Sequence, residues 1–215
     1  MAYTTLLLDL DDTVYPPSTG IWDLIGVRIN LFIQEKLGFP ATQVSTLRES
    51  LFYKYGTTLR GLQLEYNIDP VEYLDFVHQV PIEDLVSPDR RLQQQLAGFA
   101  LPKWIFTNAS RQHALRVMRR LQIDTTITGI IDILDISPYC KPMSEAFTLA
   151  VEKSGALSPG ECILVDDSPR NLSTARQMGM FTIQVGNQPH LDAHEQIETI
   201  HDLPSVLPAL EGASA

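Results

Sequence analysis

Two short apolar segments with the character of buried β-strands lie far apart in this chain. The first, residues 3–9 (YTTLLLD), stops abruptly at the polar sequence DLDDT, and the second, residues 103–107 (KWIFT), starts after Pro102. Short apolar runs that break into polar loops are typical of the central strands of a parallel sheet. Roughly ninety residues separate the two, far more than an ordinary strand connection, so we expect the intervening segment to have a hydrophobic centre of its own.

The intervening segment has the apolar periodicity of helices. Residues 21–37 place apolar side chains at helical intervals and end at Gly38 and Pro40, a pattern that commonly terminates a helix. Three further stretches show the same periodicity: residues 44–55, 57–66 and 70–79. We therefore expect a separate domain of about four helices over residues 17–87.

After this segment, strand and helix patterns alternate. The expected strands are residues 103–107, 129–136, 162–165 and 181–185, and the expected helices are residues 111–121, 144–153, 169–178 and 203–210. Alternation of this kind indicates a parallel sheet covered by helices on both faces. The sequence thus predicts an α/β fold, in which a doubly wound parallel sheet is built from residues 1–16 and 88–215 and the helical domain of residues 17–87 is inserted into it.

The composition narrows the class of partner. The chain has 215 residues, 44% of them apolar, and a formal net charge of -10, which disfavours nucleic acid polymers and membranes as partners. No apolar run is long enough to cross a bilayer, and the N-terminal residues lack the basic stretch and small-residue cleavage site of a secretory signal, so we expect none. We expect a cytoplasmic monomer or homodimer that acts on a small molecule. Four arginines on one expected helix lie among acidic neighbours and indicate a solvated face rather than a binding patch: Arg111, Arg116, Arg119 and Arg120.

Three of the expected strands stop at residues that can carry chemistry. The first strand is followed by Asp9, Asp11, Asp12 and Thr13, the second ends in Thr107 and Asn108, and the strand at 162–165 is followed by Asp166, Asp167 and Ser168. Lys141 lies in a loop just before a helix. In an open parallel sheet the loops after the strands meet along one edge, where ligands bind. These segments therefore bring carboxylates, a hydroxyl, an amide and an ammonium group to one place.

This combination of groups suits one kind of chemistry. Clustered carboxylates repel one another and raise one another's pKa values unless a cation neutralises them, and a site with few oxygen ligands suits Mg²⁺. Thr107 and Lys141 are then available to bind the oxygens of a tetrahedral dianion. Phosphoryl transfer through an aspartyl phosphate is the reaction that needs a carboxylate nucleophile, a metal and these two groups together.

In chain order, these motifs resemble those of the haloacid dehalogenase-like superfamily of Asp-nucleophile phosphohydrolases. LLLDLDDT is similar to its DxDxT nucleophile motif, IFTN to its Thr/Ser motif, the lysine of CKP to its lysine motif and ILVDD to its acidic motif. DxDxT alone is a weak signal, whereas the ordered set, which spans positions 9 to 167, is specific. The resemblance implies a Rossmann-like catalytic core, a helical cap domain over residues 17–87, and Mg²⁺ as the cofactor.

The resemblance also implies roles for the acidic residues. Asp9 would be the nucleophile that attacks phosphorus and would also bind the metal. Asp11 would protonate the leaving oxygen and then activate water, and its backbone carbonyl would be a further metal ligand. An acid at this second position favours phosphate esters over the substrates of the dehalogenases and phosphonate hydrolases of the superfamily. Asp166 and Asp167 would complete the metal site, and we expect Asp167 to be the direct ligand.

Three other residues match the phosphate-binding positions of the superfamily. Lys141 and Thr107 would hold the phosphoryl oxygens, and Asn108 would help through its backbone N–H group. Asn171, in the helical turn after the acidic motif, would orient the acidic loop. All of these residues are expected at the same edge of the sheet as Asp9.

Four stretches further resemble the pyrimidine 5′-nucleotidase branch of the superfamily: DLDDTVYPPSTGI, KYGTTLRGL, FVH and IFTNAS. That branch removes phosphate from nucleoside monophosphates, so the resemblance implies a substrate such as UMP or CMP. In the cap, Arg60 would pair with base or phosphate oxygens, and Tyr55, Thr57 and Thr58 would face the nucleoside. A helix-packing Tyr55 and a solvated Arg60 fit the same pattern equally well.

Two other functions remain open at this point. A sugar phosphatase or phosphomutase on the same fold would share every core residue, and the cap alone would distinguish it. A non-enzymatic phospho-accepting signalling module also groups an acidic pair, an accepting Asp, a Thr and a Lys. In receiver modules, however, the acidic pair precedes the accepting Asp, whereas here Asp166 and Asp167 come last. The sequence therefore favours a magnesium-dependent phosphomonoesterase.

Overall fold

The structure, a computed structural model, describes residues 3–207 and contains a six-stranded parallel sheet. The strand order is β3-β2-β1-β4-β5-β6, and each neighbouring pair is parallel. The strands are β1 (Thr5–Leu8), β2 (Lys103–Phe106), β3 (Gly129–Ile131), β4 (Cys162–Asp166), β5 (Phe181–Val185) and β6 (Glu195–Ile197). The chain runs outward from β1 to β3 and then crosses to β4 on the other side of β1. The predicted doubly wound sheet is therefore confirmed, with one strand missed: β6 contains a single apolar residue and lies at the edge.

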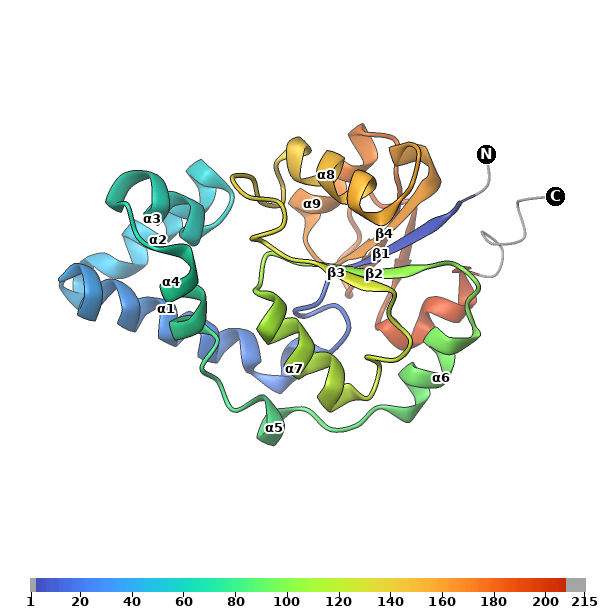
Figure 1. The fold of residues 1–215 in the computed structure, drawn as a ribbon, viewed down its shortest axis with the longest axis horizontal. Coiled ribbons are helices and arrows are strands. Elements are labelled where there is room, and N and C mark those ends of the chain that lie inside the picture. The colour runs from blue at the N-terminus through green and yellow to red at the C-terminus, as the bar shows by residue number, and fades with distance from the viewer. Residues whose placement is uncertain (1–2, 208–215) are drawn as a thin grey trace.

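Helices cover both faces of the sheet (Figure 1). Helices α6 (Arg90–Gly98) and α7 (Arg111–Leu121) lie on one face, and α8 (Ser144–Ser154) and α9 (Pro169–Gln177) lie on the other. Three 3₁₀ helices complete this part: η1 (Pro17–Thr19), η2 (Pro159–Glu161) and η3 (Ile200–Ser205). Because successive side chains of a strand point to opposite faces, Leu6 and Leu8 belong to one hydrophobic cluster and Leu7 to the other. Of the helix expected at 203–210, residues 208–210 lie outside the described residues.

The segment between β1 and β2 forms a cluster of helices to one side of the sheet (Figure 1). Its members are α1 (Ile21–Leu37), α2 (Ala41–Tyr55), α3 (Thr58–Tyr66) and α4 (Pro70–Val77). Helix α1 packs against α2 and α4, and α2 packs against α3. A fifth short helix, α5 (Ile82–Leu85), packs instead against α7 beside the sheet. The sheet with its inserted helical cap agrees with the predicted fold class, while the cap limits at residues 17 and 87 remain a prediction.

Arginines of α7 hold the segment that returns from α4 to the sheet. Arg116 donates through Nη1 to the His78 carbonyl at 3.1 Å and through Nη2 to the Val80 carbonyl at 2.8 Å. Arg120 Nε donates to the Val86 carbonyl at 2.6 Å. The expected solvated basic face is therefore wrong for these two arginines, because their guanidinium groups satisfy backbone carbonyls of the linker.

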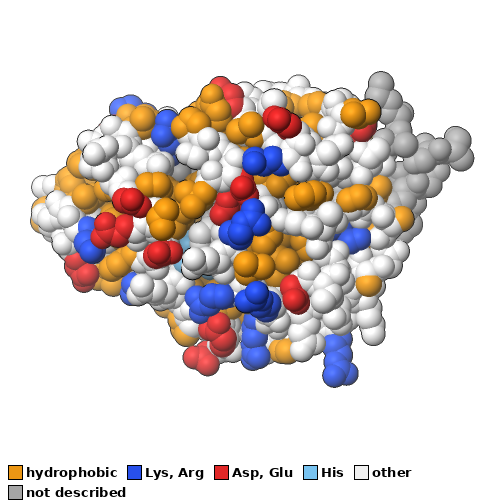
Figure 2. Space-filling model, viewed as in Figure 1, with side chains coloured by type: hydrophobic (Ala, Val, Ile, Leu, Met, Phe, Trp, Pro, Cys, Tyr) orange, Lys and Arg blue, Asp and Glu red, His pale blue; other side chains and the backbone are white. Residues whose placement is uncertain are grey.

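The surface carries charges of both signs. On the face shown in Figure 2, Lys and Arg side chains stand beside Asp and Glu side chains rather than forming one continuous basic area. Such a mixture agrees with the negative net charge of the sequence. Within residues 3–207, none of the helices combines the length and the apolar character that a membrane crossing requires.

Candidate active site

The carboxyl end of β1 carries a buried ion-pair centre. Lys141 Nζ donates hydrogen bonds to Asp9 Oδ1 and to Asp166 Oδ2, both at 2.8 Å. Asp9 follows β1, Asp166 is the last residue of β4, and these two strands pair in parallel, so the sheet itself places the carboxylates side by side. Lys141 is 1% exposed and Asp166 is 0% exposed. Each buried charge therefore depends on the others for its stabilisation.

The centre holds more negative than positive charge. Asp9, Asp166 and Asp167 each have one carboxylate oxygen that lies within 4.8 Å of the other two. Burial raises the pKa of Asp9 well above its ordinary value, and the charges of Asp166 and Asp167 add to the rise against the opposing effect of Lys141. Burial, and then the Asp166 charge, raise the pKa of Asp167 to about 6. Three carboxylates around one ammonium group form the hard oxygen donor set that suits Mg²⁺, so these residues fit that ion.

The two carboxylates of the acidic motif differ in how fully they are bonded. Asp166 Oδ1 accepts from the Ser168 backbone N–H and from Asn171 Nδ2, both at 2.9 Å, while its Oδ2 carries the ion pair. Asp167 Oδ1 accepts only the Thr13 hydroxyl, at 3.2 Å, among the bonds within residues 3–207. Asp167 therefore has the freer carboxylate for a metal ion, and Asn171 directly contacts the acidic loop.

Asp11 is held by two side chains. His113 Nε2 bonds to Asp11 Oδ1 at 2.8 Å, and the Tyr15 hydroxyl donates a short hydrogen bond to the same oxygen. The buried His113 ring stacks on His78, with 4.4 Å between the ring centroids. Burial alone would raise the pKa of Asp11, but the charge and hydrogen bond of His113, together with the Tyr15 hydrogen bond, lower it below its ordinary value. Both bonds end on Oδ1, so Oδ2 has no bonding partner within the described chain.

The end of β2 supports the lysine loop. Asn108 Nδ2 donates to the Lys141 carbonyl, and Asn108 Oδ1 accepts from the Lys141 backbone N–H, both at 2.9 Å. The buried Thr107 hydroxyl accepts from the Ala109 N–H at 2.9 Å. Thr107 and Asn108 line the same cavity as Asp9 and Lys141. The Asn108 side chain thus fixes the backbone that carries Lys141.

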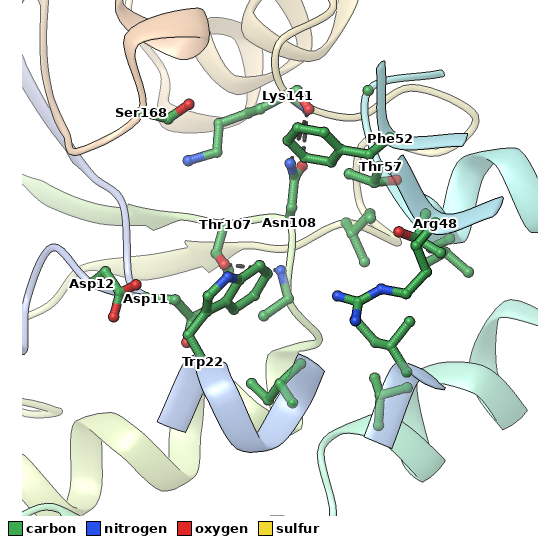
Figure 3. A pocket seen from close by; sticks show the side chains of 18 of the residues that line it. Asp11, Asp12, Trp22, Arg48, Phe52, Thr57, Thr107, Asn108, Lys141 and Ser168 are labelled. Carbon is green, nitrogen blue, oxygen red and sulfur yellow. Dashed lines mark hydrogen bonds between the residues drawn. The ribbon is translucent and has the colours of Figure 1, made fainter. Parts of the chain in front are cut away.

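A cavity of about 610 Å³ lies between this sheet edge and the helical cap. On the cap side it is lined by Trp22 of α1 and by Arg48, Phe52 and Tyr53 of α2, which we call the cap wall. Figure 3 shows Trp22, Arg48 and Phe52 reaching toward the space beside the core residues Asp11, Thr107 and Lys141. The cavity therefore has a charged core side and a mixed cap side, on which aromatic rings and Arg48 lie among apolar residues and Glu49.

The turn between α2 and α3 lies directly against the lysine loop. Gly56 in this turn has a φ of +91°, and a Cβ at this position would lie 2.9 Å from Cys140 Sγ. The buried Cys140 thiol donates to the Tyr55 carbonyl at 3.5 Å, and the Thr57 hydroxyl donates to Cys140 Sγ at 3.8 Å. Glycine is needed here for both its backbone conformation and its lack of a side chain. The turn in this way joins the cap to the residue that precedes Lys141.

One predicted site residue lies away from the cavity. Arg60 lines a separate small crevice beside Tyr139 and is not among the residues that line the main cavity. Thr57 and Thr58 do line the cavity, whereas the Tyr55 hydroxyl donates to Glu65. The core residues are brought together as expected: Asp9, Asp11, Thr107, Asn108, Lys141, Asp166 and Asp167. A substrate role for Arg60 remains a prediction that its position does not favour.

Several residues of the site were not assigned from the sequence. Tyr15 and His113, the partners of Asp11, were given no role, although Tyr15 lies in the stretch DLDDTVYPPSTGI and His113 lies in the first turn of the helix that follows Thr107 and Asn108. This position, at the edge of the sheet where the motifs meet, could have identified His113 as a site residue from the sequence. The cap wall gave no signal, because its residues are spread over two helices whose relative placement the sequence does not specify.

The chain matches a family model described as haloacid dehalogenase-like hydrolase over residues 3–179. It is 29% identical over 219 aligned positions to Phosphate metabolism protein 8 from Saccharomyces cerevisiae, an alignment that covers 92% of this chain and 64% of that protein. It is 28% identical over 133 positions to Beta-phosphoglucomutase from Bacillus subtilis, covering 61% of this chain and 57% of that protein. The chain thus spans less than two thirds of the length of these relatives.

Solved structures share the fold over nearly the whole chain. The HAD-hydrolase YfnB from Bacillus subtilis, solved with bound magnesium, superposes with a TM-score of 0.64 at 20% identity, covering 96% of this chain and 99% of that chain. The beta-phosphoglucomutase from Clostridium difficile superposes with a TM-score of 0.62 at 16% identity, covering 99% of this chain and 98% of that chain. At these identities the likeness concerns the fold.

Proposed function

This chain belongs to the haloacid dehalogenase-like hydrolase family, and from that premise we propose that it is a magnesium-dependent phosphomonoesterase that works through an aspartyl-phosphate intermediate. The observation that carries the proposal is the grouping of Asp9, Lys141 and the acidic pair at the end of β1, with Asp11 two residues further on. A nucleophile, a phosphate-binding cation, a metal-binding carboxylate set and a proton donor are all parts that this reaction requires.

In the first step Asp9 attacks the phosphorus atom. Its carboxylate oxygen forms a bond to phosphorus as the bond to the ester oxygen breaks, which leaves an acyl phosphate on Asp9. Lys141, which already pairs with Asp9 Oδ1 at 2.8 Å, would neutralise charge on the phosphoryl oxygens as they approach. The Thr107 hydroxyl and the Asn108 backbone N–H would bind the remaining oxygens.

Asp11 would handle the protons of both steps. The charge and hydrogen bond of His113 outweigh burial and lower the pKa of Asp11, so the free Asp11 is ionised, and His113 Nε2, which lies 2.8 Å from Asp11 Oδ1, would supply the proton that Asp11 passes on. The departing alkoxide is a much stronger base than a carboxylate, so it draws that proton through Asp11. In the second step Asp11 accepts a proton from the water that attacks the acyl phosphate, which regenerates Asp9 and releases phosphate.

The carboxylates of Asp9, Asp166 and Asp167, with the Asp11 backbone carbonyl, are the groups that would hold Mg²⁺. When bound, the ion supplies charge screening to the phosphoryl group. The less fully bonded Asp167 is the acidic-motif residue proposed to contact the ion directly, since Asp166 already accepts from Asn171, Ser168 and Lys141.

The proposed substrates are pyrimidine nucleoside 5′-monophosphates such as UMP and CMP, small phosphate esters that the resemblance to the nucleotidase branch suggests. A cytoplasmic location and a monomeric or homodimeric state remain proposals as well. A sugar phosphatase or phosphomutase is the second candidate, and the sequence similarity to the Beta-phosphoglucomutase from Bacillus subtilis favours it.

Phosphate release from a panel of esters tests the proposal. Purified protein is assayed with UMP, CMP, ribose 5-phosphate, glucose 6-phosphate and β-glucose 1-phosphate, with Mg²⁺ and with a chelator. We expect multiple turnover on UMP or CMP, loss of activity on chelation and recovery on adding Mg²⁺. Turnover that persists with chelator would remove the metal from the proposal. Preference for a hexose phosphate would select the second candidate, and stable phosphorylation of the protein without release would select the signalling module.

A further inference from the structure

The aromatic residues of the cap wall share an unusual exposure. Within residues 3–207, the exposed Trp, Tyr and Phe side chains are Trp22 (49% exposed), Phe52 (39%) and Tyr53 (67%). All three line the cavity that contains Asp9. Single exposed apolar side chains are ordinary, but exposed aromatic rings gathered around one concave site mark a binding surface for an apolar or flat ligand group.

Arg48 adds a fixed hydrogen-bond donor to this wall. Its Nη1 donates to the Gly26 carbonyl at 2.9 Å and to Asn30 Oδ1 at 2.7 Å. These two acceptors lie on α1, so Arg48 of α2 is held across the helix pair. Its Nε and Nη2 groups make no hydrogen bond with the described residues, and Figure 3 shows the guanidinium group directed into the cavity. Arg48 therefore offers positioned N–H donors to an acceptor on the ligand.

The half-exposed Phe52 ring is contacted by a cation of the core and by the neighbouring Tyr53 ring. The guanidinium group of Arg170, from α9 of the core, lies over the Phe52 ring at 4.6 Å from its centroid. Arg170 Nη1 also donates to the Phe52 carbonyl at 3.4 Å. The core thus holds Phe52 from one side, so a ligand ring would meet the opposite face. A ring held in this way loses little freedom when a ligand stacks on it.

We propose that the cap wall is a nucleobase subsite, in which the base stacks on Trp22 and Phe52 while Arg48 donates to a carbonyl oxygen of the base. This inference rests on the proposed phosphatase activity and assigns the residues of the same cavity that would bind the base. A nucleoside monophosphate has the matching layout, since its phosphate and its aromatic base lie at opposite ends of one small molecule. Aromatic side chains recognise bases by stacking, and arginine recognises their oxygen acceptors.

The first experiment compares two esters that differ only in the base. The ratio kcat/KM is measured with Mg²⁺ for UMP and for ribose 5-phosphate, with wild type, Trp22→Ala and Phe52→Ala. We expect each substitution to lower the value for UMP about tenfold or more and to leave ribose 5-phosphate almost unchanged. Leu64→Ala is the matched control, because Leu64 is an exposed apolar cap residue, 53% exposed, that lies outside the cavity.

A second comparison isolates Arg48. Uracil carries carbonyl oxygens and adenine carries none, so Arg48→Met is expected to lower kcat/KM for UMP more than for AMP, with little change for ribose 5-phosphate. Equal losses on UMP and ribose 5-phosphate would place Arg48 at the phosphate or the sugar and overturn its assignment. Equal losses for Trp22→Ala on the two esters, or none, would overturn the subsite itself. Because hexose faces also lie against aromatic rings, glucose 6-phosphate is assayed alongside.

A binding measurement separates failure of the subsite from failure of the enzyme. Trp104 is the second tryptophan of the chain, and its Nε1 has no hydrogen-bond partner within residues 3–207, so Trp104→Phe removes its fluorescence without breaking a hydrogen bond. In the Asp9→Asn/Trp104→Phe double variant, UMP is expected to quench the fluorescence of Trp22, whereas ribose 5-phosphate is not. Quenching without turnover in the wild type would refute the phosphatase and keep the subsite. Turnover without quenching would refute the subsite and keep the phosphatase.

Discussion

The two sides of the cavity are built in opposite ways. On the core side, Lys141 and Asp166 are almost fully buried, and Lys141 is bonded to both Asp9 and Asp166. On the cap side, Trp22 and Phe52 are more than a third exposed, and Arg48 keeps donors without a partner in the described chain. The ion pairs of Asp9, Lys141 and Asp166 form within the protein alone, whereas the cap side presents exposed rings and hydrogen-bond donors that a ligand could contact.

This difference indicates that the core side carries out the reaction and that the cap side selects the substrate. A buried network of charges tolerates no change, because the loss of one member leaves another without its partner. Exposed side chains on a helix surface can be exchanged at small cost to stability. The cap wall can therefore determine which ester is bound, while the core side performs the same reaction on each. Substitutions on the two sides should differ accordingly in what they damage.

The largest expected effect is that of Asp9→Asn on turnover. The amide is isosteric with the carboxylate but is not a nucleophile, so kcat should fall by about 10⁴-fold or more. The fold should be retained, because Asn can still accept a hydrogen bond from Lys141. Phosphate release and thermal unfolding measured on the same samples check both parts. Asp124→Asn, the same change at an exposed position in the turn that follows α7, is the control and should leave both unchanged.

Removal of a cation from each side provides a matched comparison of stability. Lys141→Met should lower the free energy of unfolding by about 3–5 kcal/mol, since it leaves the Asp9 and Asp166 carboxylates buried without their counterion. Arg48→Met removes two hydrogen bonds near the surface and should cost about 1 kcal/mol. Urea unfolding in the presence of a chelator measures both. Equal costs for the two variants would contradict the contrast between a closed core side and an open cap side.

The core side was predictable from the sequence because the carboxyl ends of parallel strands lie at the same edge of a sheet. Asp9, Thr107 and Asp166 each stand at the carboxyl end of a short apolar run, and parallel pairing puts such ends at one edge whatever the connections between them. Lys141 was placed by resemblance, since it follows no strand directly. Its neighbour Asn108, predicted to act through its backbone, also fixes the lysine loop through its side chain, a detail that spacing alone does not contain.

The cap side was not predictable for a related physical reason. The periodicity of residues 21–37 correctly indicated a helix, but it does not say which helix pairs with which or how they are rotated. Arg48 lies in the middle of α2 and Arg60 in the first turn of α3, and only the packing of these helices decides that Arg48 lines the cavity and Arg60 does not. The edge strand β6 was missed because its Glu and Gln side chains are exposed and give no apolar alternation.

His113 lies on the core side of the cavity and is a buried hydrogen-bond partner of Asp11. His113→Ala should lower kcat for UMP about 100-fold, because Asp11 loses the partner that supplies its proton. For p-nitrophenyl phosphate, whose leaving phenolate needs no proton, the loss should be much smaller. His113→Gln keeps a hydrogen-bond donor for Asp11 but cannot supply a proton, so it should not recover the activity on UMP. Equal losses on both esters would show that His113 acts on something other than leaving-group protonation.

His78 lies between the two sides, at the end of α4 where the cap meets the core. Burial, and then the charge of His113, lower the pKa of His78 to about 3 from an ordinary value of 6.5. Its ring stacks on His113, its Nδ1 bonds to Ser110 Oγ at 3.0 Å, and Arg116 binds its carbonyl. The folded protein therefore keeps His78 neutral over a pH range in which the unfolded chain protonates it.

The sign of the pH effect follows from that difference. The unfolded state binds a proton at His78 below about pH 6.5, and the folded state does not until about pH 3, so stability is complete at neutral pH and is lost as the pH falls between these values. From pH 7.5 to pH 5 the loss should be about 2 kcal/mol. His78→Asn keeps a hydrogen-bonding group for Ser110 and cannot titrate in this range. Urea unfolding at both pH values should therefore show a pH dependence about 2 kcal/mol weaker in the variant than in the wild type, and identical slopes would mean that the junction between cap and core opens enough to protonate His78 without unfolding.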